Sequence, residues 1–371
     1  MRTGELAQAK EFRFALASCQ YPHGLFDRKP AGASLSALAK HADDVSLALM
    51  VGDQIYADAT AGLVDPSRED ELYELPHQRA FRQPAMRRVM QRMPVQMLLD
   101  DHELFDNWEP LPRGLPPDED SLRLKRLRKK ISSARKHGVA AYLHFQRMLP
   151  KKLWPHGPLD FYFEAGGHAF YMLDTRTERQ RSRPSEPAAF GSIVGGAQQR
   201  QLEAWLLQHR DQVKFIATPS LFLPRRKQST TPGDGDACRA DAWDGFPTSM
   251  RWMLAFIEKH ELRKIVMLSG DEHHSLHSET WVGAMRIKVV TVHSSALYAP
   301  YPFANGRPRD LMGKECNNYG GKTFDVDTFF VPPGDGFAVL DVMGDSTAPL
   351  LRIEYAKAGG SGAVSVRVAL T

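Results

Sequence analysis

The chain has 371 residues, of which 42% are hydrophobic and 25% are charged. This is the composition of a globular protein with a sizeable buried core, and it excludes a fibrous or disordered chain. The formal net charge of +4 is compatible with anionic substrates, but it is too small for a protein that coats nucleic acid. The cysteines Cys19, Cys238 and Cys316 are too few and too oddly numbered for a disulfide framework, which favours a reducing compartment.

Two kinds of segment that would place the chain outside the cytoplasm or in a membrane are not seen. Residues 1–14 contain no apolar stretch long enough for a signal peptide. No run approaches the ~18 apolar residues that a membrane helix needs. We therefore expect a cytoplasmic protein without a transmembrane segment. We also find no internal repeat and expect residues 1–371 to form a single domain, whereas the sequence does not indicate an oligomeric state.

Short apolar runs rich in branched residues recur along the chain and predict buried strands. They cover residues 12–17, 46–51, 95–99, 169–173, 214–217 and 264–268. Helical patterns separate them, for example at residues 197–209 and 247–260. This alternation predicts a layered α/β fold. From Gly336 onward the chain alternates as three further strands, which we expect to be antiparallel and to close the second sheet.

Three other segments depart from this pattern. Residues 109–152 open with prolines and continue with a run of lysines and arginines, which predicts either a solvated basic helical insertion or a cationic lid that attracts phosphate-bearing substrates. Residues 176–196 and 224–241 are irregular and rich in arginine, proline and glycine. Long loops of this kind in a compact domain are often functional.

Polar residues follow five of the predicted strands at the point where each strand ends. The five clusters are Ser18-Cys19-Gln20, Gly52-Asp53-Gln54-Ile55-Tyr56, Asp100-Asp101-His102-Glu103, Asp174-Thr175-Arg176 and Ser269-Gly270-Asp271-Glu272-His273-His274. In α/β sheets the ligand crevice lies beyond the carboxyl ends of the strands. We therefore expect polar groups from distant parts of the chain to meet there.

Such a cluster predicts a cation site, because carboxylates held close together repel one another. Its nitrogen, oxygen and sulfur atoms suit a transition metal better than magnesium alone. Asp53 could bridge two ions, and two metals can clamp a phosphoryl group and activate water at neutral pH. Taken singly, Cys19, Tyr56 and Asp53 have ordinary structural explanations as a buried apolar residue, a packed ring and a helix cap. Their common position at strand ends favours the site.

The motifs that carry this cluster resemble those of the PhoD-like (alkaline phosphatase D) branch of the calcineurin-like metallophosphoesterases. The resemblance extends from Phe12 to about Val342. It rests on the segments FRFALASCQY, MVGDQIYAD, LLDDHELFDNW, LDTRTER, DAWDGFP and VMLSGDEHHS, which occur in the family's order. GD or DH alone would be weak evidence, whereas the GDQIY, DDHE and GDEHHS blocks are specific together.

The resemblance implies a four-layer α/β/β/α sandwich with two or more metal ions at one edge. It implies that Cys19 binds an iron ion as thiolate, that Tyr56 binds it as phenolate and that Asp53 bridges the metals. The second metal, for which calcium, zinc or manganese are candidates, is expected at Asn107 together with Asp100 or Asp101.

The resemblance also assigns roles beyond these ligands. Asp271 and His273 are implied to complete the metal site. His102 occupies the position of a histidine that assists the leaving group in related enzymes. Arg176 is a candidate phosphate clamp, because a guanidinium can hold phosphate oxygens bidentately.

Two departures from the family pattern bear on these expectations. The family often has two asparagines after its DDHE block, whereas this chain has Asp106 and Asn107. An added carboxylate that touched metal would change the metal preference or affinity. The chain also begins almost at the catalytic domain, without the N-terminal β-sandwich and secretion signal of many relatives, which argues against an extracellular phosphate-scavenging role.

The expected function is therefore hydrolysis of a phosphomonoester or phosphodiester by metal-activated water. One alternative is a nuclease or a phospholipid-directed phosphodiesterase that docks through the basic insertion, although nothing in the sequence specifically indicates a nucleic-acid partner. A second alternative is a metal-binding scaffold without catalysis. A third treats the polar clusters as caps and turns and predicts no bound metal.

Overall fold

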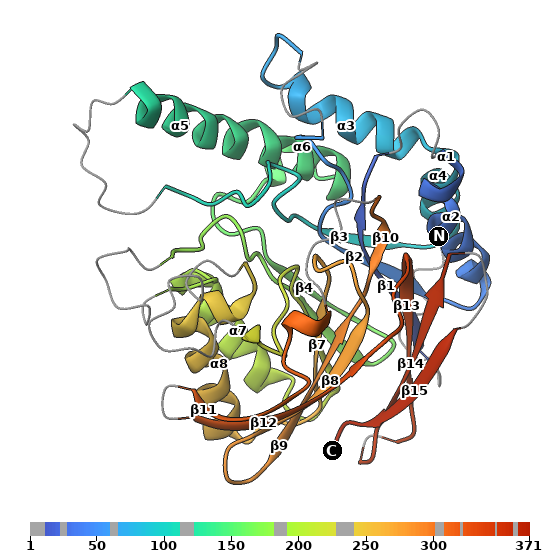
Figure 1. The fold of residues 1–371 in the computed structure, drawn as a ribbon, viewed down its shortest axis with the longest axis vertical. Coiled ribbons are helices and arrows are strands. Elements are labelled where there is room, and N and C mark those ends of the chain that lie inside the picture. The colour runs from blue at the N-terminus through green and yellow to red at the C-terminus, as the bar shows by residue number, and fades with distance from the viewer. Residues whose placement is uncertain are drawn as a thin grey trace.

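The computed structural model describes residues 12–22, 28–59, 66–111, 122–181, 191–227, 241–300, 308–319, 322–345, 347–358 and 363–371. Two β-sheets face each other across a hydrophobic core, and helices pack on the outer face of each sheet (Figure 1). This is a four-layer α/β/β/α sandwich, which confirms the fold class predicted from the sequence.

The first sheet combines parallel strands from the N-terminal part of the chain with antiparallel strands from its end. Its order is β15 (Val364–Ala369), β14 (Leu350–Lys357), β13 (Gly336–Met343), β1 (Phe12–Gln20), β2 (Leu47–Val51) and β3 (Val95–Leu98). Strands β1, β2 and β3 are parallel, with Leu16 opposite Leu49. The short strand β10 (Ala296–Tyr298) also pairs with β1 in parallel.

The second sheet has eight strands among the described residues. Its order is β11 (Lys314–Tyr319), β12 (Lys322–Phe330), β8 (Leu276–Val282), β9 (Ile287–His293), β7 (Ile265–Ser269), β6 (Lys214–Ala217), β5 (His168–Met172) and β4 (Phe161–Ala165). Strands β5, β6, β7 and β9 are parallel to one another. Both sheets therefore contain a parallel set whose carboxyl ends can form a site.

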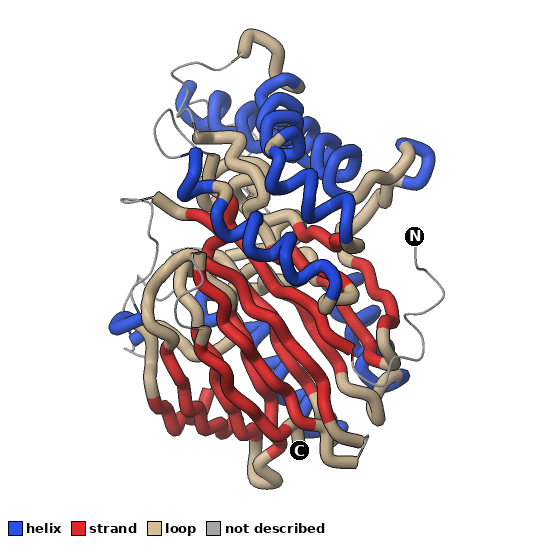
Figure 2. Tube along the Cα trace, turned by 90° about the vertical axis from the view of Figure 1, so that its right-hand side faces the viewer, coloured by secondary structure: helices blue, strands red, loops and turns tan. Residues whose placement is uncertain are grey.

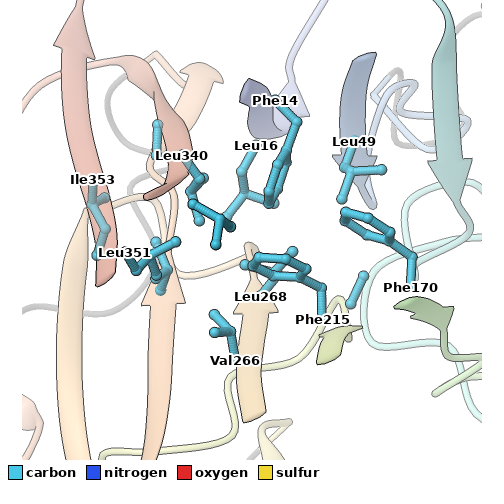
Figure 3. Packing of buried hydrophobic residues seen from close by; sticks show 14 of the residues in the cluster. Phe14, Leu16, Leu49, Phe170, Phe215, Val266, Leu268, Leu340, Leu351 and Ile353 are labelled. Atoms are coloured by element: carbon cyan, nitrogen blue, oxygen red, sulfur yellow. The ribbon is translucent and has the colours of Figure 1, made fainter. Parts of the chain in front are cut away.

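The inter-sheet core, which we define as the apolar cluster between the two sheets, is rich in aromatic rings (Figure 3). The ring centroid of Phe14 lies 5.3 Å from that of Phe170 and 4.9 Å from that of Phe215. Successive side chains of a strand point to opposite faces, so Phe14 and Leu16 enter this core, whereas Ala15 packs toward the outer helices. Burial on both faces explains why β1 reads as an almost continuous apolar run.

Helices cover both outer faces. On the second sheet lie α7 (Gly196–Gln208) and α8 (Pro247–His260), and on the first lie α2 (Ala33–Lys40) and α4 (Pro84–Arg92). A proline opens α8 and another opens α4, where the missing N–H has no helical partner to lose. The predicted helices at 197–209 and 247–260 are thus confirmed.

A third group of helices gathers at one end of the strands (Figure 2). It contains α3 (Glu71–Arg82) and α5 (Leu122–Ser133), and the chain continues after α5 as wider turns and the short α6 (Val139–Ala141) as far as Gln146. Buried side chains including Trp108 and Tyr142 form its own apolar cluster. Most described side chains of α5 are exposed, including Lys125, and the role of this basic segment stays a prediction.

Two predictions about strands need correction. The C-terminal strands β13, β14 and β15 are antiparallel as predicted, but they extend the first sheet, because β13 pairs with β1 and places Ala338 opposite Leu16. Strand β1 also continues to Gln20, because β10 pairs with its end, with Ser18 opposite Ala296. Cys19 therefore lies within a strand.

Some predictions fall partly outside the described residues. Residues 182–190 and 228–240, which belong to the two irregular segments, are among them, as is Cys238. Among the helices that the structure describes, none is long and apolar enough to cross a membrane. The cytoplasmic location stays a prediction.

Candidate metal centre

The carboxyl ends of strands from both sheets bring the predicted ligands together. One ligand atom from each of Asp53, Asp100, Asp101 and Asp271 lies within 4.8 Å of those from the other three. The sulfur of Cys19 lies 3.5 Å from Oδ2 of Asp53. We call this group, with the adjoining Tyr56, the strand-end cluster. Its six members come from β1 and from the loops after β2, β3 and β7, which are four of the five strand ends where the sequence predicts polar clusters.

The backbone at the predicted ligands is unusual. Among the described residues, nine non-glycine positions have positive φ, and five of these are predicted metal ligands: Cys19, Asp53, Asn107, Asp271 and His273. A left-handed backbone costs of the order of 1–3 kcal/mol for such residues and clusters at functional sites. The folded structure therefore holds the ligands in conformations that an isolated loop would avoid.

Two glycines allow the loops to approach one another. A Cβ atom at Gly52, whose φ is +101°, would lie 2.6 Å from Cβ of Asp100. A Cβ atom at Gly270 would lie 2.3 Å from Cβ of Ser18. Both distances are too short for carbon atoms, so the glycines of the two Gly-Asp pairs are required by packing.

Glu103 ties the loops after β2 and β3 to each other. Its fully buried carboxylate accepts hydrogen bonds from the backbone N–H groups of Asp53 at 3.1 Å and Asp100 at 2.9 Å. It also accepts from the N–H of Gln54 at 2.8 Å and from the side-chain amide of Gln146 at 3.0 Å. Glu103 thus positions two carboxylates of the cluster without itself belonging to it.

The electrostatics of the cluster disfavour its negative charges. Burial raises the pKa of the Cys19 thiol well above its usual range, and the nearby Asp53 and Asp271 raise it further. Burial and the neighbouring acids likewise raise the pKa of Tyr56, Asp53 and Asp271. Burial raises the pKa of Asp100 to about 7, although Arg176 opposes the shift. A cation among these groups would stabilise all of their ionised forms at once.

The chemistry of the donors also fits a metal ion. The hydroxyl of Tyr56 and Oδ2 of Asp100 are buried and have no hydrogen-bond partner among the described residues. Buried polar atoms are nearly always hydrogen-bonded, because an unpaired one costs about 1–3 kcal/mol. Thiolate, phenolate and carboxylate donors together are typical of iron and other transition-metal sites. The cluster therefore has the composition and the open donor atoms of a metal centre.

His102 lies beside the cluster and is oriented by a second acid. Its Nδ1 is 2.9 Å from Oδ1 of Asp58, and its ring lies 4.1 Å from the ring of Tyr56. Burial lowers the pKa of His102, but the hydrogen bond with Asp58 and the charge of Asp101 outweigh it and raise the pKa to about 9. The ring is thus held in one orientation with a preference for the protonated form.

Arg176 is placed differently from an open phosphate clamp. Its guanidinium is fully buried, and it donates to Asp100 on one edge and to Asp241 on the other. A third carboxylate, that of Asp101, lies 3.4 Å away. Burial would raise the pKa of Asp241, but Arg176 and Arg179 hold it well below its usual range. This geometry favours a role in holding carboxylates of the cluster over direct contact with substrate.

Asn107 and His273 stand at the margin of the cluster. Asn107 is exposed, its backbone N–H donates to Oδ2 of Asp101 at 2.6 Å, and its side-chain amide donates to Asp106 at 3.0 Å. His273 is half-buried and follows Asp271 by two residues. The assignment of both residues as metal ligands stays a prediction.

Three residues that support the site were not predicted from the sequence. Glu103 stood in the recognised DDHE block but received no role. Asp58, which orients His102, and Asp241, which pairs with Arg176, were not singled out as functional. Asp241 lies in the DAWDGFP block, so its motif was a usable signal. No sequence signal marked Asp58, because its partner His102 is 44 positions away in the chain.

The chain is 25% identical over 302 residues to alkaline phosphatase D of Bacillus subtilis (strain 168). The aligned region covers 74% of this chain and 48% of that protein. The chain thus spans about half the length of this curated relative.

Two solved structures share the fold. The structure of PhoD superposes with a TM-score of 0.65 at 18% identity and covers 97% of this chain and 69% of its own. A purple acid phosphatase from yellow lupin (Lupinus luteus), PPD1, superposes with a TM-score of 0.57 at 12% identity. The match covers 98% of this chain and 54% of the lupin chain.

The region that matches a family model contains the strand-end cluster. The model of the PhoD-like phosphatase family matches residues 14–295, which include every member of the strand-end cluster. This range is more than half of the chain and contains the motifs that suggested the resemblance. The chain therefore belongs to the PhoD-like phosphatase family.

Proposed function

We propose that this protein hydrolyses phosphoesters with a water molecule activated by metal ions at the strand-end cluster. The observation that carries the proposal is the meeting of four carboxylates, a thiol and a phenol at buried strand ends. Family membership supports it, since the curated relative is named a phosphatase. The finer points, which are the metal dependence, the metal identities and the choice between monoesters and diesters, are part of the proposal.

Cys19 and Tyr56 would hold one ion, for which iron is the best candidate, and Asp53 would bridge it to a second. Asp101 and Asn107 would hold the second ion, with calcium, zinc or manganese as candidates, and Asp271 and His273 would complete the set. Bound ions would lower the pKa of a water molecule and neutralise charge on the phosphoryl oxygens.

The chain's own residues would handle the leaving group. In hydrolysis a water oxygen bonds to phosphorus, the ester P–O bond breaks, and its electron pair stays on the departing oxygen. His102, held by Asp58, would donate its Nε2 proton to that oxygen. Arg176 would keep Asp100 and Asp101 oriented toward the ions.

The test is turnover of chromogenic phosphomonoesters and phosphodiesters by protein loaded in turn with iron, zinc, manganese and calcium, with metal content measured in parallel. Asp53→Asn should abolish hydrolysis of both ester classes and lower the bound metal. Asp43→Asn is the matched control, because Asp43 is an exposed acid that pairs with Arg92 and precedes β2, whereas Asp53 follows the opposite end of that strand. Unchanged turnover by Asp53→Asn would refute the proposal.

A further inference from the structure

A cavity of about 820 Å³ adjoins the strand-end cluster, and the hydrolysis proposed above assigns no role to it. It lies among α1 (Arg28–Ala31), α2, α3 and α4. Its wall includes Tyr56, a member of the cluster, and also Gln20 and Gln54, which directly follow Cys19 and Asp53. A group bound at the metal centre could therefore extend into this cavity. Its volume falls in the range of about 300–1,000 Å³ that is usual for small-molecule sites.

Much of the wall is apolar. Ile55 and Ala57 contribute from the loop after β2, and Leu72, Leu75 and Ala80 contribute from α3. Such a surface binds a hydrocarbon or aromatic group by removing it from water, which is worth about 25 cal/mol for each Å² of apolar surface. The wall is thus suited to a bulky organic group and not to inorganic phosphate alone.

The charged residues around the cavity are almost all of one sign. Five described lining residues are basic, and they are exposed: Arg28, Lys29, Arg79, Arg82 and Arg88. Glu71 is the one acidic residue among the described lining residues. A concave surface lined by one sign of charge concentrates ions of the opposite sign. The rim therefore favours a ligand that carries a negative charge in addition to the phosphoryl group at the metal centre.

Two amide oxygens add a third requirement. Oε1 of Gln20 and Oε1 of Gln54 are buried and have no hydrogen-bond partner among the described residues. Their orientation is determined, because Nε2 of Gln20 donates to the carbonyl of Ala31 at 2.9 Å and Nε2 of Gln54 donates to that of Gly52 at 2.5 Å. Flipping either amide would set two oxygens against each other. The open oxygens can accept hydrogen bonds from ligand hydroxyl or N–H groups.

We propose that this cavity binds the organic part of the substrate and selects phosphoesters of one class. The class has a bulky, largely apolar group with hydroxyl or N–H donors and a second negative charge. The inference rests on the proposed function, because it assumes that the phosphoryl group is bound at the strand-end cluster. It makes the basic residues of α3 and α4, and not those of α5, the determinants of substrate choice.

The test compares two chromogenic diesters that share a 4-nitrophenyl leaving group. One carries methyl as its second group, and the other carries carboxynaphthyl. The carboxynaphthyl ester should have the higher kcat/KM, and Arg79→Gln/Arg88→Gln should lower the ratio of the two kcat/KM values about tenfold, the loss expected for one charge-assisted contact. Arg87→Gln is the matched control, because Arg87 is an exposed arginine of α4 that does not line the cavity. An unchanged ratio in the double variant would overturn the inference.

A second measurement separates failure of this inference from failure of the proposed function. The fluorescent apolar anion 1-anilinonaphthalene-8-sulfonate should bind the metal-free Asp53→Asn variant, in which hydrolysis plays no part. Ala33→Trp, which fills a half-buried position of the wall, and Arg79→Gln/Arg88→Gln should each weaken this binding about tenfold. Dye binding that these changes leave unaltered would overturn the inference even if the protein hydrolyses small esters. Loss of binding in both variants would support the cavity as an anion-binding apolar site, and a lack of ester turnover would then count against the proposed function and not against the cavity.

Discussion

The strand-end cluster and the inter-sheet core are built from the same strands but are stabilised in opposite ways. Strand β1 contributes Phe14 to the core and Cys19 to the cluster. Strand β7 contributes Leu268 to the core, and the loop that follows it contributes Asp271 to the cluster. In the core, apolar side chains pack closely against one another. In the cluster, buried acids repel one another and the backbone is left-handed at several positions.

This difference shows where the stability of the fold originates. The core needs only its own side chains, so it can hold the strands in register whatever happens at their ends. The cluster costs part of that stability, and a bound cation would offset this cost. Changes in the core should therefore alter stability and leave metal binding intact, whereas changes in the cluster should alter metal binding and, through the lost ion, stability as well.

The largest expected effect is that of metal removal. Chelation should abolish hydrolysis and lower the free energy of unfolding, because an ion at about 100 to 1,000 times its Kd stabilises the folded state by about 3–4 kcal/mol. Activity assays and thermal unfolding of the same sample, before and after readdition of metal, would measure both. If activity survives complete removal of metal, as checked by elemental analysis, the cluster does not need a cation and the contrast with the core is wrong.

Replacing a core ring should affect stability alone. Phe215→Ala removes a buried ring that lies 4.9 Å from both Phe14 and Phe170, and should lower the free energy of unfolding by about 3–5 kcal/mol. Denaturant unfolding would give the value, and the metal content of each folded molecule should not change. Phe329→Ala, at a ring that is 45% exposed, should cost much less. Equal losses in the two variants would contradict the assigned core.

Glu103→Gln should affect both properties moderately, because Glu103 connects the two regions. The amide would replace one acceptor oxygen by a donor that faces backbone N–H groups, for instance those of Asp53 and Asp100. We expect kcat to fall about 10- to 100-fold and stability to fall by about 1–3 kcal/mol. Glu74→Gln, at an exposed glutamate of α3, serves as the control. A variant with normal kcat and metal affinity would show that Glu103 does not position the ligands.

The smallest expected effect is a pH dependence of the core. Burial lowers the pKa of His168, which packs beside Phe12 and Phe215, to about 4. The unfolded chain, with a pKa of about 6.5, binds a proton that the folded chain does not. Stability is therefore lost as the pH falls from about 6.5 to 4, by about 1–2 kcal/mol after allowance for partial exposure. His168→Leu should flatten this part of the stability curve, whereas His156→Leu, at an exposed histidine, should leave the curve unchanged.

The sequence by itself determined the strands of the core and the chemistry at their ends. Runs of branched residues predict buried strands because a strand covered on both faces must be apolar throughout. The polar residues that interrupt these runs predicted that Cys19, Asp53 and Asp271 would meet, since parallel strands end at a common edge. Motif order identified the family for the same reason, because five of the six motifs are strand ends.

Tertiary structure alone decided which groups support the site and how the strands are distributed. The alternating pattern of β13–β15 is the same on either sheet, so only the pairing of β13 with β1 could assign them. Three of the four hydrogen bonds to Glu103 come from positions 43 to 50 residues away, and no local pattern encodes them. From the sequence Arg176 is a candidate phosphate clamp, and only the tertiary structure shows that it is buried between Asp100 and Asp241. In each case the deciding contact joins distant residues, and such contacts exist only after the sheets have packed.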